Sequence, residues 1–233
     1  MKISTVTGVS WERSTIEQTR RHWFGIFIVV YGLFVFAPFL APVFMHEGWA
    51  GAGKAIYLLY SLLCHQLPER SFFFFGSKPM YSLAEIQAAW QNTADPMVLR
   101  RFLGSPSMGW KIAWSDRMIS FYTGVWLFAL AWFPLRNRVQ RLPWWGAAIL
   151  LLPMIVDGGS HAVSDLAGIG QGFRDTNHWL VLLTRSAFPA GFYAGDALGS
   201  FNSWMRFLTG LLAGLAIVWL VFPYLHQETS SSL

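Results

Sequence analysis

The sequence predicts an all-α fold, a polytopic transmembrane helical bundle with four full spans and one short or re-entrant helix. Three observations lead to this prediction. Of the 233 residues, 54% are hydrophobic and only 12% are charged, whereas soluble domains average about 25% charged residues. Aromatic residues reach 17%, with 13 Trp and 20 Phe, which suits a protein anchored at two membrane interfaces. Several apolar runs are also long enough to cross a hydrocarbon core of about 30 Å.

The first two apolar runs differ in strength. Residues 23–45 can span the membrane, and Pro38 and Pro42 are expected to bend the second half of this helix. Residues 50–67 are interrupted by Lys54. Their apolar stretch of about ten residues would cover about 15 Å as a helix, half the hydrocarbon core. We expect a re-entrant or interfacial helix here, and a full span at this position gives the five-span alternative.

Three further apolar runs complete the four predicted spans, at residues 117–135, 144–156 and 205–224. Two long connections separate the spans, at residues 68–114 and 158–204. In the first connection, Ser82 followed three residues later by Glu85 has the spacing of a capping box and predicts a short helix.

The predicted domain organisation is a cytoplasmic N-terminal segment (1–22), one transmembrane helical domain (23–225) and a flexible tail (226–233). Arginines collect on the cytoplasmic side of membrane proteins. Arg20 and Arg21 precede the first span, and Arg136, Arg138 and Arg141 follow the span at residues 117–135. An even number of crossings between these two groups therefore places both long connections on the outer side of the cell membrane.

Three basic residues of the first connection dilute this charge bias: Arg100, Arg101 and Lys111. Five spans would instead place the polar residues of the connections in the cytoplasm. The net charge of +5 is explained by arginines that flank spans. Since no Lys/Arg-rich run with interleaved aromatics exists, no nucleic-acid partner is expected.

Charged residues at the edges of apolar runs are the main functional signal, because such charges are costly unless they pair or serve a site. Asp157 is expected at a helix C-terminus, followed by the helix-terminating Gly158-Gly159, where the helix dipole disfavours a carboxylate. Arg117 and Arg206 carry the opposite charge at helix N-termini. A pair between Asp157 and one of these arginines would resolve both costs and tie the helices together.

Anion binding and metal binding are the two kinds of chemistry predicted for these edges. Arginines recognise phosphate or carboxylate groups, and a lipid headgroup is the obvious membrane anion. The predicted binding residues are Gln66, Arg70, Arg117, Asn202 and Arg206. A divalent metal such as zinc would accept N, O and S donors. The candidate ligands are Cys64, His65, Asp116, Asp157 and His161.

His65 and Asp157 are also the candidate catalytic residues, as base or acid. The structural alternatives are simpler. Cys64, the single cysteine, would pack as a small hydrophobe, and Ser115 and Asp116 would serve as N-cap and first-turn acid of the helix that follows.

Four segments in order along the chain carry a resemblance: residues 64–72 (Cys-His-Gln-Leu-Pro-Glu-Arg-Ser-Phe), 115–124, 157–161 and 202–210. Together they resemble the motifs of an uncharacterised prokaryotic membrane family, domain of unknown function 2085. The resemblance implies a membrane location and no particular activity. Ser115 stands where that family has its second cysteine and His161 where it has glutamine, so a site built on two cysteines would be lost or remodelled.

The sequence therefore predicts a multi-pass integral membrane accessory or binding protein with a polar cluster at one surface. Its expected partners are membrane lipids and other membrane subunits. The subunits would dock at Gly210 and Gly214, whose small-xxx-small spacing lets helices approach closely. The alternative is a membrane-embedded enzyme, metal-dependent in one version, that acts on a lipid-linked or anionic substrate.

Overall fold

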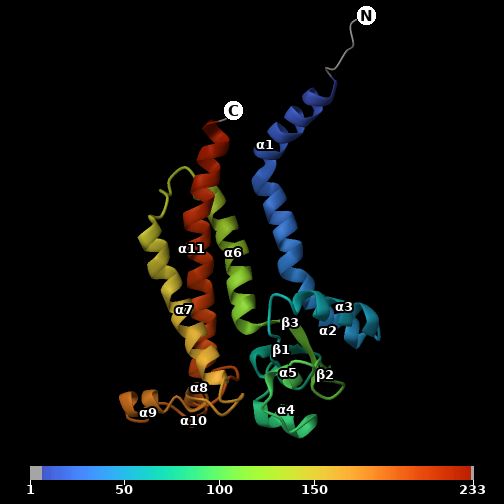
Figure 1. Ribbon diagram of the computed structural model, residues 1–233, viewed down its shortest axis with the longest axis vertical. Helices are drawn as coiled ribbons and strands as arrows, with labels where there is room; N and C mark the ends of the chain where they lie inside the picture. The colour runs from blue at the N-terminus through green and yellow to red at the C-terminus, as the bar shows by residue number, and fades with distance from the viewer. Residues whose placement is uncertain (1–6, 232–233) are drawn as a thin grey trace, which may run out of the picture.

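The computed structural model describes residues 7–231, with side chains for residues 22–227. Four long helices dominate it: α1 (Thr7–Phe36), α6 (Asp116–Leu135), α7 (Trp144–Asp165) and α11 (Phe201–Ser231). Figure 1 shows α11 between α6 and α7, with α1 on the far side of α6. Both long connections lie at one end of the bundle, and the loop between α6 and α7 lies at the other, which is the arrangement that four crossings require.

Four helical stretches of the described chain are long and apolar enough to cross a membrane: His22–His46, Asp116–Leu135, Trp144–Asp165 and Phe201–Gln227. They correspond to the four predicted full spans. The first is broken into the end of α1, the 3-10 helix η1 (Ala37–Phe39) and α2 (Leu40–His46). Pro38 and Pro42 fall in this broken part, as expected from their missing backbone donors. The next helix, α3 (Ala50–Tyr60), has only 11 residues, and a fifth span is not established.

The helix that carries Asp157 is longer than predicted. α7 continues through Gly158-Gly159 to Asp165, so Asp157 lies about two turns inside the helix and the prediction of a helix end there was wrong. A helical glycine costs about 1 kcal/mol relative to alanine. Here it makes room for a neighbour, because a Cβ on Gly158 would lie 2.6 Å from Nη1 of Arg117. The second connection therefore begins after Asp165.

The all-α prediction also missed a small sheet. The first connection contains η2 (Pro68–Arg70), β1 (Ser71–Phe74), α4 (Leu83–Ala89), α5 (Pro96–Leu99), β2 (Gly104–Ser105) and β3 (Gly109–Ser115). The strands form an antiparallel sheet in the order β1-β3-β2. Two of the strands have four residues or fewer, too short to give a clear alternating pattern.

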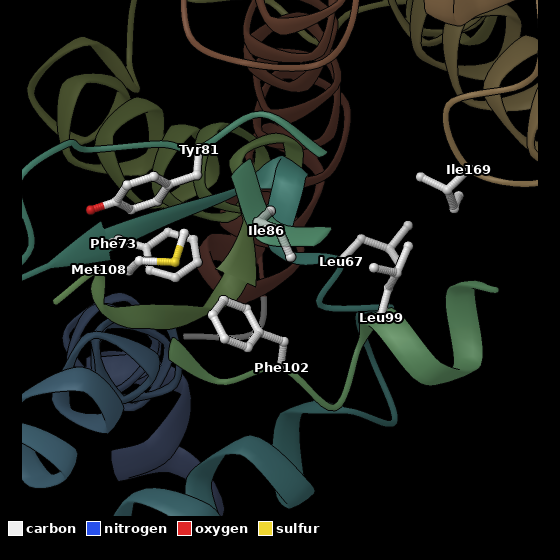
Figure 2. Packing of buried hydrophobic residues seen from close by; sticks show 8 residues of the cluster. All are labelled: Leu67, Phe73, Tyr81, Ile86, Leu99, Phe102, Met108 and Ile169. Atoms are coloured by element: carbon white, nitrogen blue, oxygen red, sulfur yellow. The ribbon is translucent and has the colours of Figure 1, made fainter. Parts of the chain in front are cut away.

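A compact apolar cluster holds this connection together (Figure 2). Its buried members are Leu67, Phe73, Tyr81, Ile86, Leu99, Phe102, Met108 and Ile169. Ile169 belongs to the second connection, and its backbone N–H donates to the carbonyl of Ala94 at 3.0 Å, so the two connections are joined. The predicted capping box is present at the start of α4, with Ser82 and Glu85 bonding each other's backbone N–H.

The second connection carries three short helices: α8 (Phe173–Thr176), α9 (His178–Thr184) and α10 (Ala190–Tyr193). It leads into α11, which begins at Phe201, earlier than the predicted start at residue 205. α11 also continues to Ser231, through most of the segment predicted to be a flexible tail. Residues 232–233 lie outside the described part of the chain.

The glycines of the small-xxx-small pair, Gly210 and Gly214, pack against another helix of the same chain. A Cβ on Gly210 would lie 2.1 Å from Oγ of Ser120, and one on Gly214 would lie 2.9 Å from the backbone N of Val125. Both glycines therefore face α6 at close range. The surface predicted to receive another membrane subunit is already occupied by a helix of the same chain, so that docking prediction does not hold for this pair.

Candidate functional site

Asp157 is the centre of a buried polar cluster at the end of the bundle that carries both connections. Its carboxylate is 2% exposed. One oxygen accepts from Nη2 of Arg117 at 2.7 Å, and the other accepts from Nη2 of Arg174 at 2.6 Å. The predicted pair with Arg117 is present. Arg174 comes from the second connection, so Asp157 joins α6, α7 and α8 through charge-assisted hydrogen bonds.

Arg206 does not pair with Asp157, which corrects the alternative partner predicted from the sequence. Its Nε donates to both oxygens of Asp116 at 2.8 Å. Its Nη1 donates to Oδ1 of Asp196 at 2.5 Å, and its Nη2 donates to the Asp196 carbonyl at 2.6 Å. α11 is thereby fastened to the first turn of α6 and to the second connection.

Arg70 completes the arrangement from the first connection. Its two Nη atoms donate to Asp165 at 2.6 and 2.7 Å, and its Nε donates to Oδ2 of Asp196 at 2.7 Å. Asp196 therefore bridges Arg70 and Arg206. Burial by itself would raise the pKa of the Asp196 carboxyl, but these two guanidinium groups outweigh it and hold the pKa below its usual range.

We call these residues the ion-pair cluster: Arg70, Arg117, Arg174, Arg206, Asp116, Asp157, Asp165 and Asp196. The cluster contains four arginines and four aspartates, and each arginine contacts at least one of the aspartates. It holds no surplus of positive charge. The arginines predicted to grip an anion are already occupied by carboxylates of the chain itself.

The first turn of α6 differs in detail from the sequence prediction. Ser115 occupies the N-cap position, but its side chain makes no capping hydrogen bond. Instead its Oγ lies 3.4 Å from Sγ of Cys64. Asp116 does take the first-turn role, since its Oδ1 accepts from the backbone N–H of Arg117 at 2.8 Å in addition to holding Arg206.

The Cys-His-Gln segment forms a tight turn. Sγ of Cys64 accepts from the backbone N–H groups of Gln66 and Ser115 at 3.4 and 3.3 Å. Gln66 has a φ of 53°, a left-handed conformation that is uncommon for a residue other than glycine. It is held there because its Nε2 donates to the Tyr57 carbonyl at 2.9 Å and its own carbonyl accepts from Nζ of Lys111 at 2.6 Å. The side chain of Gln66, a predicted binding residue, thus fixes the turn.

The predicted metal ligands do not converge. Among the described side chains, no group of three or more His, Cys, Asp or Glu residues is placed to hold a metal ion. His65 is exposed. His161 is buried against the cluster, with its Nε2 3.2 Å from Nη2 of Arg174 and 4.0 Å from Asp157. A cation beside a guanidinium group is electrostatically disfavoured, so these residues do not fit the divalent metal that the sequence suggested.

Asn202, another predicted binding residue, fixes the second connection. Its Nδ2 donates to the carbonyls of Arg174 and Gly195 at 2.8 and 3.0 Å. Its Oδ1 accepts from Nδ2 of Asn177 at 3.1 Å. Both asparagine side chains are buried and hold the backbone that presents Arg174 to Asp157.

Sequence reasoning missed three members of the cluster: Asp165, Arg174 and Asp196. A signal for Asp165 was available, because residues 157, 161 and 165 are spaced by four and fall on one face of a helix. It was hidden by the assumption that α7 ends at the two glycines. Arg174 and Asp196 lie in an irregular, glycine-rich segment whose path has no local sequence signature.

A pocket of about 480 Å³ lies beside the cluster, between the Cys64 turn, the start of α6 and the end of α7. Its polar wall is formed by Arg70, Asp116, Arg117, His161, Asp165 and Arg206, and Cys64 and His65 lie in the wall of the turn. Leu63, Ala162 and Leu166 form an apolar rim, and Leu166 is 86% exposed. Two buried nitrogens of the polar wall have no hydrogen-bond partner among the described residues, Nε of Arg117 and Nδ1 of His161.

Long apolar helices joined at one end by buried ion pairs define a multi-pass membrane protein. Comparison with known proteins agrees. The family described as "Predicted membrane protein (DUF2085)" matches residues 107–220, which contain three of the four motifs, and this confirms the resemblance. The chain is also similar to the uncharacterised protein MJ1492 of Methanocaldococcus jannaschii, with 25% identity over 215 residues that cover 89% of this chain and 95% of that protein. No solved structure matches.

Proposed function

We propose that this protein is an integral binding protein of the cell membrane that holds the polar head of an amphiphilic ligand in the pocket beside the ion-pair cluster. One observation carries the proposal: the pocket has a charged, hydrogen-bonding wall and an apolar rim that faces outward next to a membrane span. A site with both properties suits a molecule that has a polar head and an apolar tail.

The charge balance of the wall indicates the class of headgroup. Because the four arginines are matched by four aspartates, a phosphate monoester would have to compete with carboxylates for every guanidinium group. An uncharged or zwitterionic head with hydroxyl or amide groups meets no such competition. Arg117 and His161, which line the pocket, each also keep one buried nitrogen without a hydrogen-bond partner among the described side chains.

The proposed orientation follows from charge. Arg136, Arg138 and Arg141 lie in the loop at the end of the bundle opposite the pocket, and clustered arginines favour the cytoplasmic side. The pocket then opens at the outer surface of the membrane. The prediction that the protein is an accessory subunit of a larger complex is compatible with this function and stays a prediction.

The alternative of a membrane-embedded enzyme named His65 and Asp157 as catalytic residues, but Asp157 is held by two arginines. A nucleophile for such an enzyme would be Cys64, which lies in the pocket wall and accepts two backbone N–H groups. A cysteine nucleophile needs a neighbouring base. Among the described residues no histidine nitrogen contacts its sulfur, and its side-chain neighbour is the hydroxyl of Ser115. The geometry therefore favours binding over catalysis.

The test is to identify what the full-length protein retains when it is extracted from membranes in a mild detergent. Native mass spectrometry should show a bound amphiphile in the wild type. Ala162→Trp, at the exposed rim, should displace it without touching an ion pair. Val163→Trp is the matched control, because Val163 is exposed on the next position of α7 and does not line the pocket. Equal retention by both variants, or no bound molecule in the wild type, would contradict the proposal.

A further inference from the structure

The basic residues of the first connection fall into two groups that the sequence cannot separate. Lys111 is fully buried, and its Nζ donates to the carbonyls of Gln66 and Arg100 at 2.6 and 2.8 Å. Burial lowers the pKa of Lys111 to about 7. Lys111 is therefore part of the interior. Of the other basic residues in this connection, Arg70 belongs to the ion-pair cluster and Lys78 pairs with Glu85, which leaves Arg100 and Arg101.

Arg100 and Arg101 differ from every arginine of the ion-pair cluster. Neither has a carboxylate within 4.0 Å among the described side chains, whereas each cluster arginine has at least one. Nη2 of Arg100 donates to the carbonyl of Ser61 at 3.2 Å, which orients the guanidinium group without neutralising it. Arg101 is exposed. Their charges are thus available to an anion from outside the chain.

A second pocket, of about 370 Å³, contains these two arginines. Its other wall residues include Tyr57, Leu58, Ser61 and Met97. Gln66, in the Cys64 turn, borders both this pocket and the first one. It opens to the molecular surface, and it needs no change in the ion-pair cluster to admit a ligand.

Leu58 lines the second pocket, and the segment that follows it is rich in exposed leucines. Leu58, Leu59, Leu62 and Leu63 follow one another at the end of α3 and the start of the turn, and Leu62 is 83% exposed. Met97, in the pocket wall, is exposed as well. Figure 1 places α3 at the connection end of α1, where the first span emerges. A short helix with bare apolar side chains beside basic residues is the pattern of a segment that lies in the membrane interface.

We propose that Arg100 and Arg101 bind the phosphate of an anionic phospholipid, while the leucines of α3 and the following turn lie among its acyl chains. Both guanidinium-bearing residues line one pocket and lack carboxylate partners among the described residues. Guanidinium groups bind phosphate oxygens with two parallel hydrogen bonds. The exposed leucines favour a lipid over a soluble phosphate ester, which would leave them in water. This site is independent of the ligand proposed for the first pocket.

The experiment measures binding of phosphatidylglycerol to the full-length protein in detergent micelles, with phosphatidylcholine as the neutral-headgroup comparison. Phosphatidylglycerol should bind more tightly. Each basic residue near an anionic lipid surface contributes an affinity factor of about fivefold, so Arg101→Gln should weaken phosphatidylglycerol binding by about that factor. Arg101→Glu should weaken it further. Arg101 is preferred for the test because the Arg100 side chain and carbonyl both make internal hydrogen bonds.

Two controls separate this site from its neighbours. Lys78→Gln removes one positive charge on the same side of the membrane from a residue already paired with Glu85, and it should leave binding unchanged. Ala162→Trp, which closes the first pocket, should also leave it unchanged. Equal affinity for the two lipids, or unchanged binding by Arg101→Gln, would overturn the proposal. Competition by soluble glycerol phosphate as strong as that by phosphatidylglycerol would show a phosphate-ester site and overturn the lipid assignment.

Discussion

The two arginine-containing regions at the connection end of the molecule both border Gln66 and differ in the partners of their arginines. In the ion-pair cluster, Arg206 is 2% exposed and meets Asp116 and Asp196. In the second pocket, Arg100 and Arg101 have no carboxylate in reach among the described side chains. The comparison teaches that an arginine is fixed in the fold where the chain brings a carboxylate to it, and that its charge stays available where the chain brings none.

The largest expected effect is on the ion-pair cluster. Asp157→Asn would leave Arg117 and Arg174 buried with one carboxylate fewer, and removing one partner of a buried pair costs about 3–5 kcal/mol. The apparent melting temperature in detergent should therefore fall sharply. Lys78→Gln, which breaks an exposed pair, should cost less than about 1 kcal/mol. Similar losses for the two variants would mean that the cluster does not stabilise the fold.

The next effect concerns Glu69, which is buried beside the cluster and has no hydrogen-bond partner on either carboxylate oxygen among the described residues. Burial raises its pKa from 4.5 to about 7. Between these values the folded state binds a proton that the unfolded state releases, so this residue lowers stability as the pH rises from 4.5 to about 7.

Glu69→Gln should remove that loss. Below the pKa of Glu69 in the unfolded state, the free energy of unfolding of the variant should match that of the wild type. Above the pKa of Glu69 in the folded state, it should exceed the wild-type value by up to about 3 kcal/mol. Thermal unfolding of both proteins at about pH 4 and about pH 8 checks this expectation, because other titrating groups cancel in the difference. A pH-independent difference between the two proteins would contradict it. The result would show whether Glu69, an acid beside the four aspartates of the cluster, is tolerated there only when its carboxyl group is protonated.

A smaller effect is expected where α11 meets α6. Gly210→Ala would place a Cβ 2.1 Å from Oγ of Ser120, and overpacking of this kind costs about 1–3 kcal/mol. The shift would also strain the Arg206–Asp116 pair, one turn away. Gly25→Ala is the matched control, since a Cβ there meets nothing within 4 Å. If both alanine variants unfold at the wild-type temperature, the helices do not depend on this close approach.

The smallest effect on stability tests the comparison directly. Met97→Glu supplies a carboxylate four residues before Arg101 in the same pocket, which converts an unpaired arginine into a paired one. The free energy of unfolding should change by no more than about 0.5 kcal/mol, as for most surface substitutions. Phosphatidylglycerol binding should weaken, whereas Met97→Gln should bind like the wild type. Unchanged lipid binding by Met97→Glu would show that pairing Arg101 with a carboxylate does not affect whether it binds a lipid phosphate.

Parts of the fold and site were predictable because they depend on local or very general physics. Long apolar runs must form helices in lipid, since every backbone group has to be satisfied internally. The proline bend after residue 36 and the Ser82 capping box follow from single side chains. The Asp157–Arg117 pair followed from the cost of unpaired charges. The sheet, the passage of α7 through two glycines and the partners of Arg206 were not predictable in this way.

The sequence by itself determined that the chain has four apolar spans and that its charged residues had to be neutralised where those spans end, because lipid tolerates neither free backbone groups nor lone charges. Only the tertiary structure decided which charges meet. Asp165, Arg174 and Asp196 reach Arg70, Asp157 and Arg206 because the two connections fold against each other through Ile169 and the α4–α5 segment. Such long-range contacts leave no local pattern, and among the described side chains they bring no carboxylate to Arg100 or Arg101.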